Sequence, residues 1–142
     1  MATGGHILVA DDERNLRKLL RNVLEGSGYT VAEAANGVEA LDQVRAGGID
    51  LVILDGEAAP AGGMGVCRAL KDEVYRCPPV LVLTARPQDA WLATWSRADA
   101  AVPHPIDPVV LGESVNTVTT YGYDPVTYMQ ETKVTLCKIS PA

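Results

Sequence analysis

The sequence is poor in the residues that give bulk to a core or cross-links to a chain. It contains no phenylalanine, and aromatic residues make up 5% of its 142 residues, so a core must be built from valine, leucine, isoleucine and alanine. The three cysteines, Cys67, Cys77 and Cys137, include no Cys-x-x-Cys pair, which favours reduced thiols in a cytoplasmic protein over a disulfide framework. No apolar run reaches about 18 residues, the length of a membrane-spanning helix, so we predict no membrane insertion.

Positive charge is also scarce, with 12 lysines and arginines against 18 acidic residues and a net charge of -6. Binding to nucleic acid or to an anionic membrane surface requires a positive face, so we expect no direct DNA binding. A chain of this length is long enough for one compact domain and short for two. We place that domain at residues 1–120. Residues 121–142, rich in threonine and tyrosine, form an extension of unknown role.

Short apolar runs alternate with segments of helical period along the chain. Five predicted strands cover residues 6–10, 29–34, 50–54, 80–83 and 99–102. Five predicted helices cover residues 13–25, 38–45, 66–74, 88–96 and 107–120. Repeated alternation of this kind is typical of an α/β fold with an open parallel sheet.

Polar side chains follow four of the five predicted strands at the point where each strand ends. They are Asp11 and Asp12 after the first strand, Asp55 after the third, Thr84 after the fourth and His104 after the fifth. The carboxyl ends of parallel strands form one edge, where ligands of such sheets bind. Three carboxylates at one edge repel each other unless a cation compensates them, and Mg²⁺ or Mn²⁺ suits oxygen ligands. The pattern therefore predicts phosphoryl transfer with an aspartate nucleophile, assisted by a hydroxyl and a side-chain cation.

Four motifs carry a family resemblance: ILVADDE, DLVILD, LVLTA and ADAAVPHP, which begin at residues 7, 50, 81 and 98. Together they resemble the receiver domain of two-component response regulators, over about residues 5–120. The resemblance implies a flavodoxin-like, doubly wound sheet of five parallel strands in the order 2-1-3-4-5. It also implies phosphorylation by a histidine kinase or phosphotransfer protein, and signalling through a downstream protein partner.

The resemblance assigns a role to each matching residue. Asp55 is the phospho-acceptor, Asp12 a direct metal ligand, and Asp11 a support for the metal through water. Thr84 supplies the hydroxyl that closes on the phosphoryl group, and the main-chain carbonyl of Glu57 supplies a further metal oxygen. Such a domain is not an enzyme and has at most autophosphatase activity.

Three features depart from the family pattern. His104 stands where the family has a lysine, and histidine is shorter and mostly neutral near pH 7. Ala101 stands at the position of an aromatic switch, so signalling through a swinging ring is excluded. Four residues separate Asp55 from Pro60 where the family usually has three, which enlarges the loop 56–65.

Two pairs of side chains are candidates for gating and for contacts. Glu57 and Arg86 are placed to form an ion pair over the acceptor. Trp91 and Trp95 are four residues apart and lie on one helical face; we expect one to pack inward and the other to be exposed. In the family the surface of the fourth and fifth helices binds partners and forms dimers, which makes a homodimer through this face a further expectation.

Three functions remain open at this point. The first is a single-domain receiver that is phosphorylated on Asp55. The second is a phosphorylation-independent pseudo-receiver that acts as a protein-binding module, favoured by His104 and Ala101. The third is an aspartyl-phosphate hydrolase in which Glu57 serves as the acid/base, although the acidic pair and Thr84 fit a receiver better.

Overall fold

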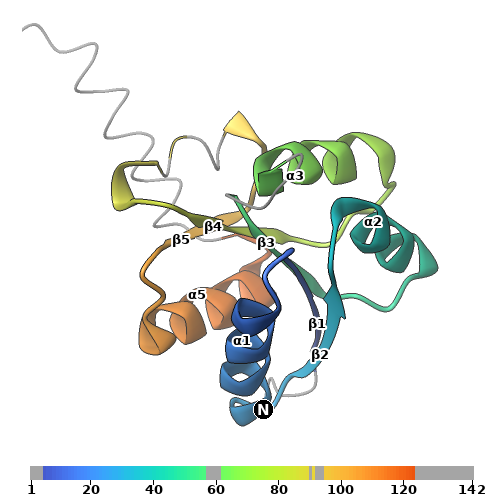
Figure 1. Cartoon of the computed structure of the whole chain (residues 1–142). Coiled ribbons are helices and arrows are strands. Elements are labelled where there is room, and N and C mark those ends of the chain that lie inside the picture. Colours follow the sequence, from blue (N-terminus) through green and yellow to red (C-terminus); the bar gives the residue numbers. More distant parts are fainter. Residues whose placement is uncertain (1–4, 57–61, 90, 92–94, 124–142) are drawn as a thin grey trace, which may run out of the picture.

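Five parallel strands form one sheet with helices on both faces (Figure 1). The computed structural model describes residues 5–56, 62–89, 91 and 95–123. The strands are β1 (His6–Ala10), β2 (Thr30–Ala34), β3 (Leu51–Asp55), β4 (Val80–Thr84) and β5 (Ala100–Pro103). Their order is β2-β1-β3-β4-β5, and all four neighbouring pairs are parallel. The expected α/β class, flavodoxin-like topology and strand order are confirmed.

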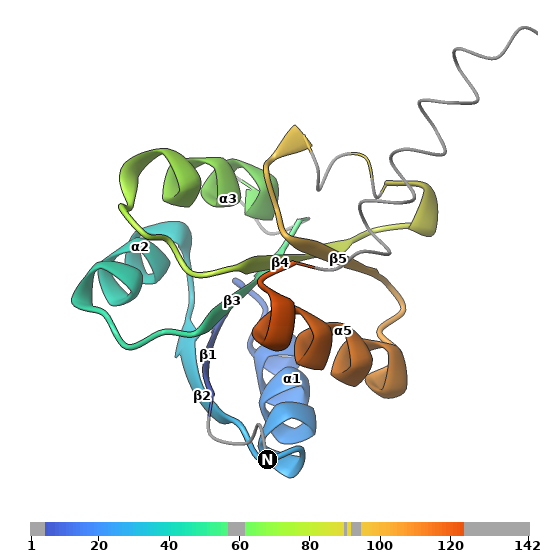
Figure 2. The same cartoon turned by 180° about the vertical axis from the view of Figure 1, so that it is seen from behind.

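The helices divide between the two faces of the sheet (Figures 1 and 2). They are α1 (Arg14–Gly26), α2 (Gly37–Ala46), α3 (Gly62–Glu73) and α5 (Pro108–Tyr121), with a short 3-10 turn η1 (Pro87–Asp89). Helices α1 and α5 pack on one face through aliphatic side chains, and α2 and α3 pack on the other. Both faces of β3 and β4 are therefore covered, and every residue of these two strands is buried. This explains why these strands are continuous apolar runs instead of alternating ones.

Most element boundaries agree with the sequence pattern, and two differ. Helix α3 begins at Gly62, four residues before the predicted start, because glycines in its first turn allow the helix to approach the end of β3 closely. Within the predicted helix at 88–96, residues 90 and 92–94 lie outside the described part of the chain; residues 88 and 89 belong to η1, and Trp91 and Trp95 are helical. Among the described residues, no helix is long and apolar enough to span a membrane.

Candidate functional site

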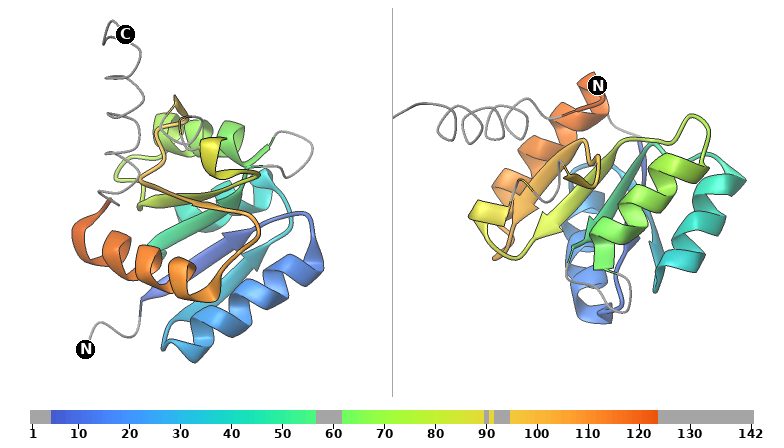
Figure 3. Two further views of the ribbon diagram at one scale, coloured as in Figure 1. Left: turned by 90° about the vertical axis from the view of Figure 1, so that its left-hand side faces the viewer. Right: turned by 90° about the horizontal axis from the view of Figure 1, so that it is seen from above.

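The predicted site residues of the described chain meet at the carboxyl edge of the sheet. Asp55 is the last residue of β3 and Thr84 the last of β4, while Asp11 and His104 directly follow β1 and β5. Because β1 and β4 both pair with β3 in parallel register, Asp11 and Thr84 lie on either side of Asp55. The views in Figure 3 show these strand ends converging on one edge.

Asp11 is buried, with 2% of its surface exposed. Its N–H donates to the Ala34 carbonyl at 3.1 Å, and its Oδ1 accepts from the Glu13 N–H at 3.2 Å. Its Oδ2 is buried without a hydrogen-bond partner. Burial, followed by contact with the Asp12 carboxyl and the charge of Asp55, raises the pKa of Asp11 to about 7. A buried, unpartnered acid oxygen is costly, and a bound cation would remove that cost.

The oxygen donors here suit an open site for Mg²⁺ or Mn²⁺, in which water completes the coordination, better than a site enclosed by protein ligands alone. In the described part of the chain, no group of three or more histidine, cysteine or acidic side chains is arranged to hold a metal ion. Mg²⁺ is commonly held by one or two carboxylates and keeps several waters. The exposed Asp12, the open oxygen of Asp11 and the neighbouring Asp55 fit such an open site. The carbonyl of Glu57 lies outside the described residues.

His104 lies beside the predicted acceptor. Its Nε2 is 3.7 Å from Asp55 Oδ1, and the two side chains are 31% and 11% exposed. The N–H of His104 donates to the Thr84 carbonyl at 2.7 Å, which ties the end of β5 to the end of β4. The His104–Pro105 peptide bond is cis. A protonated imidazole at this distance carries a positive charge next to the acceptor, whereas a neutral one does not.

The Thr84 hydroxyl is bound to a main-chain carbonyl in this structure. Thr84 is buried, and its Oγ1 donates to the Arg86 carbonyl at 3.2 Å. Arg86 itself donates through Nε and Nη2 to the two carboxylate oxygens of Asp89, at 3.1 and 2.8 Å. The expected contact of Arg86 with Glu57 falls outside the described residues, so it stays a prediction.

Two glycines beside Asp55 were not singled out from the sequence. A Cβ on Gly63, in the first turn of α3, would overlap the main-chain carbonyl of Asp55. A Cβ on Gly56 would lie 2.8 Å from the Leu83 carbonyl oxygen, which the Gly56 N–H binds. The glycine-rich stretch signals a close approach, but its partner is visible only in three dimensions. Both glycines fix the backbone on which Asp55 is placed.

Trp91 and Trp95 are both exposed, by 52% and 56%. The expectation that one of them packs inward is therefore wrong. Leucine and isoleucine already supply the largest fully buried side chains, so the core does not need indole bulk. The Arg68 guanidinium lies over the Trp95 ring, 4.4 Å from its centre, and covers part of this ring from α3. Ala101, at the aromatic switch position, is half-buried in β5.

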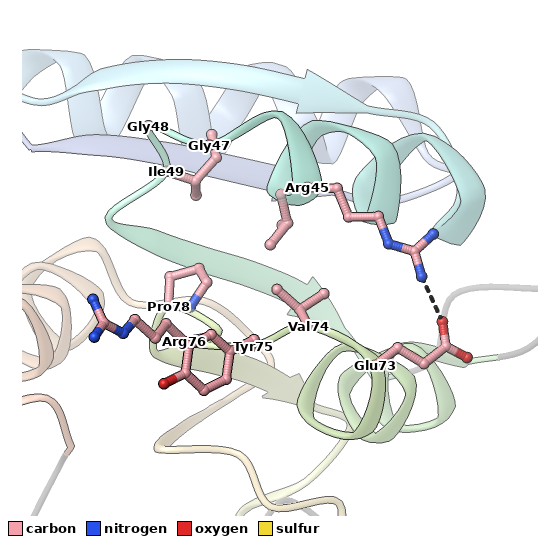
Figure 4. A pocket seen from close by; sticks show the side chains of 10 residues that line it. Arg45, Gly47, Gly48, Ile49, Glu73, Val74, Tyr75, Arg76 and Pro78 are labelled. Carbon is pink, nitrogen blue, oxygen red and sulfur yellow. Dashed lines mark hydrogen bonds and ion pairs between the residues drawn. The ribbon is translucent and has the colours of Figure 1, made fainter.

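Two hollows on the helices lie apart from the strand ends. One of about 400 Å³ lies at the C-terminal ends of α2 and α3, where Arg45 pairs with Glu73 at 3.2 Å (Figure 4). The other, of about 600 Å³, is an apolar groove between the same helices, lined by Val38, Leu41 and Val66 among others. Neither contains a predicted site residue, so the chemistry stays at the carboxyl edge of the sheet.

Comparison with known proteins gives the same assignment as the site. A family model described as the response regulator receiver domain matches residues 7–116. A response regulatory protein of Mycobacterium tuberculosis is 63% identical over 120 residues, which cover 80% of this chain and 90% of that protein.

Solved structures agree with the family model. Response regulator TrrA of Thermotoga maritima, in complex with Mg²⁺ and BeF, is 35% identical with a TM-score of 0.71, and the match covers 80% of this chain and 98% of TrrA. A putative response regulator of Chloroflexus aurantiacus is 26% identical with a TM-score of 0.77, over 83% of this chain and 99% of the other. The match to the family model over most of the chain, together with the strand order and the acidic strand ends, shows that this chain belongs to the receiver domain family of two-component response regulators.

Proposed function

We propose that this receiver accepts a phosphoryl group on Asp55 from a histidine kinase or phosphotransfer protein. The observation that carries the proposal is the unpartnered, buried Oδ2 of Asp11, which lies beside the acceptor where a divalent cation is needed. Asp12, Asp55 and, through water, Asp11 would hold Mg²⁺ or Mn²⁺, together with the main-chain carbonyl of Glu57. The bound ion supplies positive charge that offsets the carboxylates and the incoming phosphoryl oxygens.

The reaction itself is a displacement at phosphorus. A carboxylate oxygen of Asp55 forms the new P–O bond, the P–N bond of the donor phosphohistidine breaks, and its electron pair returns to the donor imidazole. The Thr84 hydroxyl would exchange its bond to the Arg86 carbonyl for one to a phosphoryl oxygen. A protonated His104 would contact another phosphoryl oxygen from the end of β5.

The proposal extends to the context of the domain. Residues 1–120 form the receiver and residues 121–142 an extension, in a cytoplasmic protein that signals by protein contacts and has at most autophosphatase activity. We expect a partner or homodimer surface on the fourth and fifth helices. Exposed apolar side chains on both segments support it: Val109 of α5 is 66% exposed, and Trp91 and Trp95 are 52% and 56% exposed.

Mass spectrometry after incubation with Mg²⁺ and acetyl phosphate tests the acceptor. The wild-type chain is expected to gain the mass of one phosphoryl group, and Asp55→Asn is expected to gain none, because an amide is not a nucleophile toward phosphorus. Asp42→Asn, which neutralises an exposed carboxylate on α2, serves as the control and should behave as wild type. A wild-type chain that stays unmodified, or equal labelling of Asp55→Asn, would contradict the proposal and favour the phosphorylation-independent module.

His104→Lys is expected to raise the phosphorylated fraction or to slow its decay. Lysine is permanently charged and reaches further than imidazole, and one added ion pair of about 1 kcal/mol corresponds to roughly a fivefold change. The decay of phosphorylated protein after removal of acetyl phosphate gives the comparison. Identical time courses for both proteins would leave His104 as a loop residue only.

A further inference from the structure

We propose that Arg17 is a positioning residue for the acidic pair Asp11–Asp12, and that Glu33 keeps the charge of Arg17 away from the site carboxylates. The inference rests on the proposed metal-dependent function and adds two residues outside its ligand set. Arg17 lies in the first turns of α1, and its side chain is 15% exposed. Its Nη1 donates to the main-chain oxygen of Asp11 at 2.6 Å, and its Nε donates to Glu33 Oε1 at 3.0 Å.

The hydrogen bond from Arg17 holds the peptide unit that joins the two acidic residues. The N–H of Asp11 is already bound by the Ala34 carbonyl of β2, and Oδ1 by the Glu13 N–H. With the carbonyl held by Arg17, Oδ2 is the atom of Asp11 that remains buried without a hydrogen-bond partner. Arg17 thereby fixes the direction in which Asp11 and Asp12 leave the main chain, without binding a carboxylate of the site.

Glu33 gives Arg17 its orientation. The carboxylate of Glu33 is bound on both oxygens, by Arg17 Nε on Oε1 and by Arg21 Nη1 on Oε2 at 2.5 Å. Its main-chain oxygen accepts from Gln43 Nε2 of α2 at 2.9 Å. Glu33 is thus anchored between α1 and α2, on a strand that pairs with β1 along its whole length.

The charge on Glu33 matters because an arginine close to a cluster of carboxylates tends to pair with them. The Arg17 guanidinium binds the main chain of Asp11, and Asp12 is the next residue in the chain. If Arg17 turned to that carboxylate, it would compete with Mg²⁺ for the same oxygens. The ion pair with Glu33 satisfies the guanidinium on the opposite side, so Arg17 does not pair with the carboxylate of Asp12.

Arg21 provides a matched control for Arg17. It lies one turn further along α1 and binds the same Glu33 carboxylate, but its other contacts are the Val31 carbonyl at 2.9 Å and the Glu25 carboxylate at 3.5 Å. Replacing either arginine by methionine removes an ion pair with Glu33 and keeps a long apolar stem. Only Arg17→Met also removes the bond to the Asp11 main chain.

Calorimetric titration of the full chain with Mg²⁺ and amide hydrogen exchange of the metal-free chain test the proposal together. Arg17→Met is expected to weaken Mg²⁺ binding about 10-fold, the usual effect of losing a group that orients a ligand, and to speed exchange at the amides of Asp12 and Glu13. Arg21→Met is expected to stay near wild type in both measurements, because Arg21 does not bind the Asp11 main chain. Arg17→Lys should bind Mg²⁺ with an affinity between those of wild type and Arg17→Met. A single ammonium group cannot reproduce the planar guanidinium, which binds Glu33 and the Asp11 carbonyl through two separate nitrogens.

Glu33→Gln tests the shielding part of the proposal. It should weaken Mg²⁺ binding more than Arg21→Met does, because Arg17 then turns to the acidic pair. An unchanged Mg²⁺ affinity in Glu33→Gln would overturn the shielding. Equal Mg²⁺ affinity and equal exchange in Arg17→Met and Arg21→Met would overturn the positioning role. A wild-type chain that binds no Mg²⁺ would overturn the proposed function instead, and the metal-free exchange rates would still decide whether Arg17 fixes this loop.

Discussion

Asp11→Asn is expected to stabilise the metal-free protein near pH 8 by about 2 kcal/mol while abolishing most of its Mg²⁺ binding. The carboxyl of Asp11 is buried with an unpartnered oxygen, and its pKa is raised from 3.8 to about 7. This rise in the pKa means that ionising the buried carboxyl costs the folded protein roughly 4 kcal/mol at most. Water penetration and relaxation of the structure reduce such a penalty. An amide has the same shape and carries no charge, so the variant does not have this cost.

The sign of the pH dependence follows from the direction of the shift. Since the folded chain holds the Asp11 proton more tightly than the unfolded chain, this group contributes most stability below about pH 4. That contribution is lost as the pH rises through about 7. The advantage of the asparagine variant in urea unfolding should therefore grow between about pH 5 and about pH 8. The negative charge of ionised Asp11 attracts the cation, so Mg²⁺ should bind the wild type more tightly over the same rise in pH.

Asp12→Asn separates the two effects. Asp12 is exposed, so neutralising it should weaken Mg²⁺ binding with little gain in stability. Adding Mg²⁺ near pH 8 should raise the stability of the wild type by mass action, and raise that of either variant less at the same Mg²⁺ concentration. An Asp11→Asn variant that gains nothing in metal-free urea unfolding at high pH would contradict the burial argument.

The sequence predicted the strand-end side chains because their signal is local. An apolar run covered on both faces ends where the first polar residue follows, and Asp55 and Thr84 mark such ends within one residue. The strand order came from the family resemblance, since hydrophobic periodicity does not say which strands pair. The metal site and the phosphoryl transfer were predicted only by considering several strand ends together, because a single acidic residue at one strand end indicates neither.

The contacts that support the site are not local, and the sequence did not indicate them. Glu33 lies in a strand of alternating character, TVAEA, where an acidic residue suggests a solvated side chain. Its pairing with two arginines depends on how α1 lies against β2. For Trp91 and Trp95 the four-residue spacing indicated a shared face, but it did not tell whether that face meets the core or solvent. The side to which a helix turns depends on the volume already filled beneath it.

Gly63→Ala is expected to destabilise the protein by about 3 kcal/mol or more, although alanine is the better helix former. The added Cβ would overlap the main-chain carbonyl of Asp55 and crowd the Gly56 nitrogen. Overpacking usually costs about 1–3 kcal/mol when side chains can adjust, but here the obstacle is the backbone of a central buried strand. Helix α3 would have to move away from β3, and the backbone that carries Asp55 would shift with it.

Gly65→Ala is the matched control, two residues further along the same helix. A Cβ on Gly65 meets nothing within 4 Å, so alanine should stabilise the chain by up to about 1 kcal/mol through helix propensity. Urea unfolding of the two variants should therefore differ in sign. Labelling by acetyl phosphate should fall in Gly63→Ala under conditions where it remains folded, and stay unchanged in Gly65→Ala. Equal stability of the two variants would mean that α3 and β3 can separate freely, and the close approach would then have no part in placing the acceptor.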